Sequence, residues 1–395
     1  MNTNAVTNYP YLLLGGGSQN PRICCLWFET SYPELIPLGD LGGRGATPSI
    51  YALDISPDKS LIAAGSRPML DQKKRVIFPS LIRVYSRPDH WSEKFECVRY
   101  EIFVQAGLCD LAITNRGELA VACLNGNVLV FSMNEGFHPI SQFSGHSGTT
   151  FAVRWIDPGR LVSYGSDGIL KLWELDNEQP IFETSPCQPL RHGGIAQLAL
   201  SANRDELYYG SGDGQLYRLR IKTREVHSVP AHSGELCAVA YHPVKNKILT
   251  GGLSDALIKG WDPQALQCNE EYKHNAPIYG LIPISESRFC AVDGAERIVV
   301  CSFEGGISVE SKKIKFSGRS WAGPDLGALA QQISERNLRD RDEASKCAMA
   351  MIEKGDEQGA LEKIEFLAAK GFGAESAVLH CALSVSYTHL TLPTN

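Results

Sequence analysis

Short runs of apolar and β-branched residues, separated by turn residues, repeat along most of this 395-residue chain. Turns such as Asp157-Pro158-Gly159 and Asp213-Gly214 are typical of tight hairpins between strands. The two clearest groups of four runs are Phe151–Trp155, Arg160–Tyr164, Ile169–Leu175 and Pro180–Glu183, and then Leu236–Tyr241, Lys247–Gly251, Ala256–Trp261 and Cys268–Tyr272. A unit of four strands that recurs every ~40–45 residues predicts the blades of an all-β propeller.

One constellation of four side chains occurs twice within this repeat. The first copy is His146, Ser163, Asp167 and Trp173, and the second copy is His232, Thr250, Asp255 and Trp261. A small residue precedes the histidine in both copies, and the aspartate stands at the same distance before the tryptophan. His192 and His274 continue the period. A spacing that repeats in this way indicates the architecture of the whole chain.

These residues resemble the WD-repeat β-propeller family over roughly residues 10–318. The resemblance implies that the four side chains form a hydrogen-bonded network. In this network the loop between blades is joined to strands B and C, where each blade has strands A to D from the inside outward. Other copies depart from the pattern, because Asn125 replaces the aspartate and Phe131, Leu219 and Tyr85 replace the tryptophan. Such divergence leaves the expected fold unchanged.

The constellation has a structural explanation that needs no catalysis. A buried imidazole requires partners for both nitrogens, and a hydroxyl and a carboxylate supply them. The indole N–H finds its partner in the same network. A hydrolase triad would instead need one exposed nucleophile at a strained turn. We therefore interpret both copies as fold residues and expect no catalytic residue among them.

We expect a seven-bladed propeller at residues 1–318. The blade-like units begin near Tyr11, Ile50, Gly107, Thr150, Ile195, Leu236 and Pro277. The first unit shows only three clear runs, Tyr11–Gly15, Arg22–Phe28 and Glu34–Leu38. Lys313–Ser317 and Asn4–Asn8 are both candidates for its missing inner strand, since an open ring would leave an unpaired sheet edge.

The chain changes character after about Ser320. A linker at 319–324 leads to a small all-α segment of helical hairpins at 325–384. The helices are expected at Asp325–Ser334, Asp340–Lys354, Asp356–Lys370 and Ala374–Leu383. They weakly resemble tetratricopeptide-type repeats, and a plain helical bundle is the alternative. Residues 385–395 resemble a translated sequencing-library adaptor, so we expect an artefactual tail on a truncated helical segment; a genuine polar tail is the alternative.

Composition and charge narrow the classes of function. The net charge of −6 gives no reason to expect nucleic-acid binding, and no apolar run is long enough for a transmembrane helix. The 12 cysteines lack the spacing of a metal site, and the N-terminus lacks a secretory signal. We therefore expect a cytoplasmic protein without a metal, a cofactor or a membrane partner.

A rigid propeller with variable loops predicts a non-catalytic protein-interaction scaffold. In the family that the chain resembles, the D–A and B–C loops share one face that commonly contacts partners. Here an apolar and basic insertion at Ser66–Ser80 enlarges this face, and a solvated hydrophilic flap is the alternative. The candidate partner-binding residues are Met69, Leu70, Lys73, Lys74, Arg75, Phe78, Thr149, Ser166, Glu235, Ser254 and Pro277.

Two other functions are weighed against the scaffold. The chain could be the sensor propeller of a larger enzyme or signalling protein whose catalytic domain is missing from this sequence. A hydrolase with its site in the central channel would need convergent carboxylates or histidines there. The starts of the inner strands, at Thr150, Ile195, Leu236 and Pro277, offer none.

Overall fold

A computed structural model describes most of the propeller region and part of the helical segment. The described residues are 11–15, 22–27, 34–40, 50–58, 60–66, 69–70, 76–78, 80–86, 98–133, 138–192, 196–284, 286–294, 297–303, 306–315, 342–354, 356–369 and 379. The expected tail at 385–395, the linker at 319–324 and the first expected helix lie outside them.

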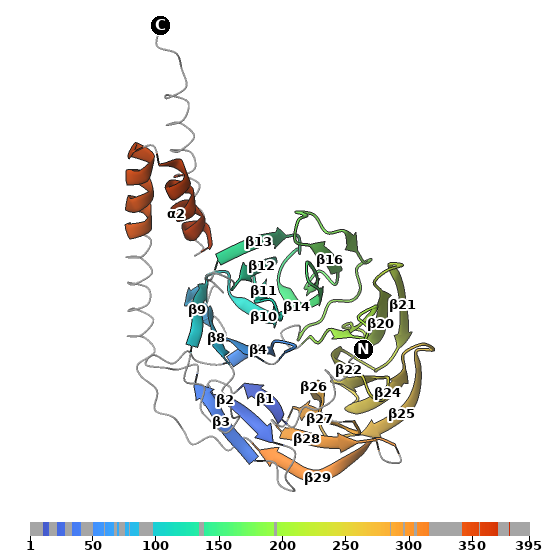
Figure 1. Cartoon of the computed structure of the whole chain (residues 1–395). Helices are drawn as coiled ribbons and strands as arrows, with labels where there is room; N and C mark the ends of the chain where they lie inside the picture. The colour runs from blue at the N-terminus through green and yellow to red at the C-terminus, as the bar shows by residue number, and fades with distance from the viewer. Residues whose placement is uncertain are drawn as a thin grey trace, which may run out of the picture.

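Six antiparallel sheets of four strands surround a central axis in the described part of the chain (Figure 1). Blade 1 is β4 (Ile50–Ile55), β5 (Leu61–Ser66), β8 (Ser80–Ser86) and β9 (Val98–Val104). Blade 2 is β10 (Leu108–Ile113), β11 (Glu118–Cys123), β12 (Asn127–Ser132) and β13 (His138–Ser144). Blade 3 is β14 (Thr150–Asp157), β15 (Arg160–Gly165), β16 (Leu170–Glu174) and β17 (Phe182–Glu183).

The remaining blades follow the same order from inner strand A to outer strand D. Blade 4 is β18 (Ala199–Leu200), β19 (Glu206–Gly210), β20 (Gln215–Arg220) and β21 (Glu225–Pro230). Blade 5 is β22 (Leu236–His242), β23 (Lys247–Gly252), β24 (Leu257–Asp262) and β25 (Gln267–Lys273). Blade 6 is β26 (Ile278–Pro283), β27 (Arg288–Asp293), β28 (Arg297–Ser302) and β29 (Ser308–Lys315).

The expectation of seven blades is wrong, although the all-β propeller itself is confirmed. The N-terminal sheet has only the strands β1 (Tyr11–Gly15), β2 (Arg22–Trp27) and β3 (Glu34–Asp40). Most of the expected closing strand, Lys313–Ser317, lies in β29, where it pairs with β28 as the outer strand of blade 6. Those residues cannot also pair with β1. The other candidate, Asn4–Asn8, lies outside the described residues.

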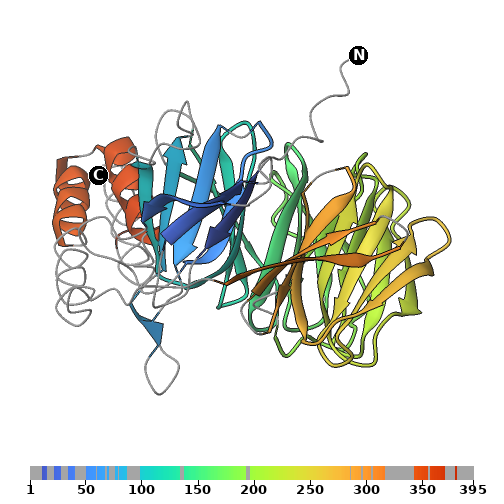
Figure 2. The same ribbon diagram turned by 90° about the horizontal axis from the view of Figure 1, so that it is seen from below.

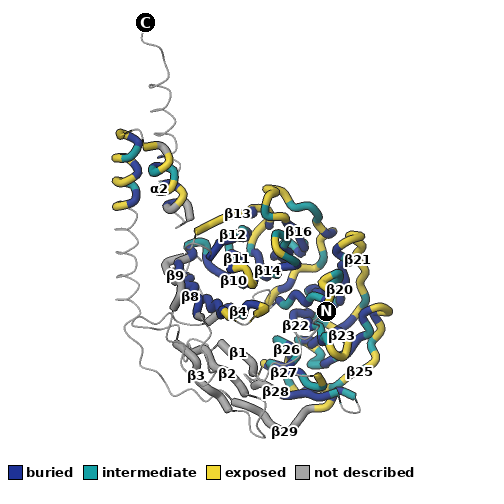
Figure 3. Tube along the Cα trace, viewed as in Figure 1, coloured by how far each residue is buried: buried dark blue, intermediate teal, exposed yellow. Residues whose placement is uncertain are grey.

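The hydrophobic core lies between neighbouring blades rather than inside any one of them. For example, Val130 of blade 2 and Trp155 of blade 3 belong to one buried cluster, and Tyr208 of blade 4 and Trp261 of blade 5 belong to another. Strand B of each blade is covered on both faces, which explains the fully buried run of β5. The outer strands β13 and β21 are mostly exposed (Figure 3). A blade therefore depends on both neighbours for its stability.

Side chains from the inner strands also bond to the backbone of other blades. The Gln197 side chain, just before β18, donates to the carbonyl of Leu281 at 3.2 Å and accepts from the Leu281 amide at 3.0 Å. The backbone amide of Gln197 donates to Cys237 in β22. One residue thus joins blade 4 to blades 5 and 6.

Two smaller elements lie outside the six blades. The insertion between β5 and β8 contains the two-stranded sheet of β6 (Met69–Leu70) and β7 (Val76–Phe78), which projects from the ring (Figure 2). Residues 342–354 and α2 (Glu357–Ala369) are helical. Ala348, Ile352, Ile364 and Leu367 are buried between these helices in a cluster that holds no propeller residue. The helices thus have a core of their own.

We expect Gln197→Ala to lower the free energy of unfolding by about 1–3 kcal/mol, because the N–H and C=O of Leu281 lose their partner. Chemical denaturation monitored by tryptophan fluorescence measures the change. Gln142→Ala is the matched control, since Gln142 is exposed on β13 and its side-chain amide bonds to Ser144 on the same strand. Equal stability of both variants would contradict the bridging role.

Candidate functional site

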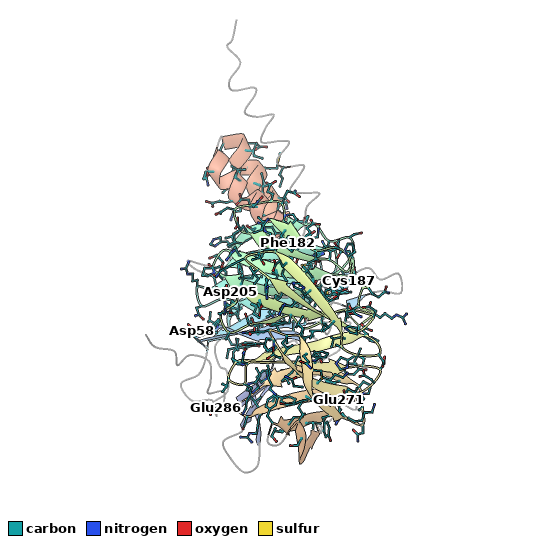
Figure 4. All side chains as sticks on the ribbon, turned by 90° about the vertical axis from the view of Figure 1, so that its right-hand side faces the viewer. Asp58, Phe182, Cys187, Asp205, Glu271 and Glu286 are labelled. Atoms are coloured by element: carbon teal, nitrogen blue, oxygen red, sulfur yellow. The ribbon has the colours of Figure 1, made fainter. Side chains whose placement is uncertain are left out.

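The loops of the propeller lie on two opposite faces. In Figure 4, Asp58, Asp205 and Glu286 come from three A–B turns on one face, and Cys187, from the connection between β17 and β18, lies on the other. The second face also carries the B–C turns, among them the turn that holds Asp167. The described loop candidates lie in D–A connections or B–C turns and therefore on this second face, called here the D–A face: Thr149, Ser166, Glu235, Ser254 and Pro277.

The structure brings the first constellation together in blade 3. Trp173 Nε1 donates to Ser163 Oγ at 2.8 Å, and Ser163 Oγ lies 2.7 Å from His146 Nε2. His146 Nδ1 lies 3.0 Å from both carboxylate oxygens of Asp167. Asp167 also accepts the backbone amides of Ser147 and Ile169. The network thus joins the D–A loop to the B–C turn and to strands B and C.

One arrangement of protons satisfies every member of this network. Asp167 is ionised and can only accept, so His146 donates through Nδ1 and accepts at Nε2. The Ser163 hydroxyl then donates to Nε2 and accepts the indole N–H of Trp173. The hydroxyl is fully buried and its proton is already used. This geometry offers no exposed nucleophile and supports a structural role.

The second constellation repeats this geometry in blade 5. Trp261 Nε1 donates to Thr250 Oγ1 at 2.8 Å, and Thr250 Oγ1 lies 2.8 Å from His232 Nε2. His232 Nδ1 lies 3.0 Å from Asp255, which also accepts the amide of Ser233. A side chain at Gly252 would collide with both His232 and Asp255, so the position requires glycine.

Burial and hydrogen bonding act on the pKa values of the second network. Burial lowers the pKa of His232 and outweighs the neighbouring Asp255 charge. Burial alone would raise the pKa of Asp255, but the amides of Ser233 and Leu257 and the charge of His232 hold it below its ordinary value. Both groups therefore stabilise the fold at neutral pH, and this contribution is lost on acidification, for His232 as the pH falls below about 6.5.

The expected histidine of blade 4 has a different partner. In the other two networks the histidine bonds to an aspartate of its own blade, and the equivalent residue in blade 4 is Asp213. Instead, His192 Nδ1 lies 2.8 Å from Glu235 Oε2 in the loop that enters blade 5. The His192 amide donates to Glu235 Oε1 at 2.6 Å, and Asp213 bonds to Ser211 instead. Residues 184–198 form a longer D–A connection than 231–235, and this length carries His192 to the next blade.

Some of the candidate partner-binding residues form hydrogen bonds that join neighbouring loops of the propeller. Thr149 Oγ1 donates to the carbonyl of Leu124 in blade 2, and the Thr149 amide donates to Ser166 Oγ. Glu235 is buried and bonds back to His192 in the same manner. Each stands three residues after the histidine of its blade. Thr149, Ser166 and Glu235 are therefore partly or wholly used within the propeller.

Other candidates are exposed and could contact a partner. Ser254 and Pro277 are exposed on the D–A face. Met69, Leu70 and Phe78 belong to β6 and β7, whose side chains lie outside the described residues, as do Lys73, Lys74 and Arg75 entirely. The sequence analysis placed His192 in the repeat but not among the candidate partner-binding residues. Its side chain is 61% exposed, and Glu235 holds its orientation.

The inner strands hold charged residues that the sequence reasoning missed. Asp54 of β4, Asp110 of β10 and Arg154 of β14 lie on three successive blades, and Arg154 Nη1 lies 2.5 Å from Asp110 Oδ2. Asp54 accepts the amide of Ile113, and Asp110 accepts the amide of Val153. The sequence argument against a central site used only the first residues of the inner strands. A charged residue inside an apolar run, such as Asp54 within Ala52–Ile55, could have indicated these positions.

These charges do not form a catalytic centre of the hydrolase type. Both carboxylates accept a backbone amide of the next blade, and Asp110 is paired with Arg154. No group of three or more histidine, cysteine, aspartate or glutamate side chains is placed to hold a metal ion in the described part of the chain. Likewise, no described helix has the length and apolar character needed to cross a membrane.

We expect Thr250→Val to lower the free energy of unfolding by about 2–3 kcal/mol, because the variant leaves His232 Nε2 and the Trp261 indole N–H unpaired in the core. Thermal unfolding followed by calorimetry measures the loss. Thr223→Val, at an exposed turn residue, is the matched control and should be neutral. A neutral Thr250→Val would mean that the network does not stabilise blade 5.

We expect Glu235→Ala to make the connection at residues 184–192 more mobile, because two hydrogen bonds between His192 and Glu235 are lost. Hydrogen exchange of peptides from this segment should become faster in the variant. Glu235→Gln, which keeps one acceptor oxygen, should show a smaller increase. Unchanged exchange in Glu235→Ala would contradict the brace.

Comparison with known proteins agrees with this geometry. Residues 137–174 and 223–262 match the family model described as "WD domain, G-beta repeat". WD repeat-containing protein slp1 of Schizosaccharomyces pombe is 25% identical over 169 residues, which cover 42% of this chain and 33% of that protein. The mouse kinesin-like protein KIF21B is 25% identical over 227 residues, 55% of this chain and 13% of that protein.

The 77 kDa echinoderm microtubule-associated protein of Strongylocentrotus purpuratus is 28% identical over 160 residues, 38% of this chain and 22% of that protein. The chain thus spans a third or less of these three relatives. The WD40 β-propeller domain of Doa1 superposes with a TM-score of 0.54 at 12% identity, over 77% of this chain and 90% of that domain. The chain is therefore a β-propeller in which residues 137–174 and 223–262 are similar to WD40 repeats.

Proposed function

We propose that this protein is a non-catalytic, cytoplasmic scaffold that binds another protein through its D–A face. WD40 propellers generally act as scaffolds for protein interactions, which gives the general class. The observation that carries the proposal for this chain is the bracing of the D–A face. Its histidine networks and its Thr149 and Glu235 bonds hold loops of adjacent blades together.

Bracing favours binding because loops that are already ordered lose little conformational entropy when a partner docks. The exposed residues Ser254 and Pro277 stand on braced loops, and exposed His192 is held by buried Glu235. The β6–β7 hairpin projects beyond the blades and adds a contact element of apolar and basic composition. The helices at 342–369 have a core of their own, which supports treating residues 325–384 as a second unit beside the propeller.

A sensor propeller of a larger enzyme or signalling protein is the second candidate. It is favoured by the small share of each relative that the chain matches, 13% in the case of the kinesin-like protein. In that case the D–A face would contact a catalytic domain of the same polypeptide. The partner surface is the same in both proposals, and only the source of the partner differs.

We expect Ser254→Arg to weaken capture of the partner at least tenfold while leaving the fold intact, because a large charged side chain would stand on the exposed D–A face of blade 5. Proximity labelling in cells, followed by titration with the purified partner, measures the effect. Val244→Arg is the matched control, since Val244 is 44% exposed in the A–B turn of the same blade on the opposite face.

Deleting Leu70–Phe78 tests the hairpin in the same assay, with circular dichroism as the check on folding. Loss of binding in the deletion and in Ser254→Arg, but not in Val244→Arg, supports the D–A face. The opposite pattern, with binding lost only in Val244→Arg, would move the site to the A–B turns.

A further inference from the structure

The charged residues of the inner strands in blades 1 to 3 are unbalanced in charge. Two carboxylates, Asp54 and Asp110, share one guanidinium, that of Arg154. Arg154 bonds directly to Asp110 at 2.5 Å and to the carbonyl of Val153. Asp54 is near enough for the charge of Arg154 to act on it but makes no direct bond to the guanidinium. When both carboxylates are ionised, the three side chains together therefore carry a net charge of about −1.

The described strands that contact β4 supply no second cation to Asp54. Strand β4 contacts β1, β5 and β10. Strand β5 contains no ionisable residue, and Tyr11 is the only ionisable residue in the sequence of β1. The group that faces Asp54 from β10 is Asp110, of like charge, and the group from β14 is Arg154. Two nearby carboxylates with one counter-charge favour uptake of a proton by one of them.

We propose that Asp54, Asp110 and Arg154 form a proton-sensitive latch, in which acidification loads one proton onto the Asp54 carboxyl and tightens the seam between the inner strands of blades 1 and 2. The proton comes from solvent, and no covalent bond changes. At neutral pH the ionised Asp54 holds the Ile113 amide across the seam but repels Asp110. The proton removes the repulsion, and the carbonyl oxygen of the neutral carboxyl still accepts the Ile113 amide.

The direction of the pKa shift of Asp54 agrees with this assignment. Burial raises the pKa of Asp54 to about 6, against the opposing effects of Arg154 and the Ile113 amide. A carboxyl whose pKa is raised in the folded state contributes stability that is fully present below its unfolded pKa of about 3.8 and is lost as the pH rises through about 6. His232 and Asp255 act with the opposite sign, so the test must compare variants at each pH.

Asp54→Asn tests the latch, because the amide oxygen still accepts from Ile113 while the charge is removed. The melting temperatures of the wild type and this variant are measured from pH 4.5 to pH 7.5. We expect the variant to be more stable than the wild type at pH 7.5 by a few degrees, and this advantage to shrink progressively as the pH falls below 6. A difference between the two proteins that is constant with pH overturns the proposal.

Two further measurements make the test specific. Asp110→Asn should lower the melting temperature at neutral pH, because it removes the direct partner of Arg154. In the wild type, the Ile113 amide resonance should titrate with a midpoint near pH 6, and this titration should vanish in Asp54→Asn. If the Ile113 resonance of the wild type does not move between pH 4.5 and pH 7.5, Asp54 takes up no proton in this range and the latch is rejected.

Discussion

The whole structure depends on contacts between blades, because a four-stranded sheet with two apolar faces cannot bury both of them alone. Every core cluster of the described propeller contains residues of two neighbouring blades. Strand B of each blade is therefore apolar on both faces, whereas strand D ends in solvent. Polar bonds that fix the position of one blade against the next therefore act together with these apolar contacts.

Polar bonds between blades occur at two radii of the ring. On the D–A face, Thr149 and Glu235 bond backward to the preceding loops. Around the axis, Asp54, Asp110 and Gln197 bond to the backbone of inner strands in other blades. The apolar contacts between the blades are not directional, and these bonds supply the direction that fixes register. The D–A face is thus braced by some of the bonds that hold the ring together.

The sequence predicted what is local and periodic. The expected run Phe151–Trp155 lies inside β14, the expected helix Asp356–Lys370 contains α2, and both histidine networks have the expected members. It could not decide the use of Lys313–Ser317, because a short strand pairs equally well with either of two sheets until the ring is built. It also could not show the partner of His192, because the length of the loop carries this residue past Asp213 to Glu235.

The residues missed at the axis show why charge within a strand is hard to interpret from sequence. Asp54, Asp110 and Arg154 are far apart in the chain, and their pairing exists only because three inner strands converge. The convergence also sets two opposite responses to acid within one fold: the network of His232 and Asp255 weakens as it gains protons, whereas the seam at Asp54 tightens. A ring in which each blade is held by its neighbours averages the two effects over the whole propeller. Stability as a function of pH is therefore expected to be flatter than either network alone would produce.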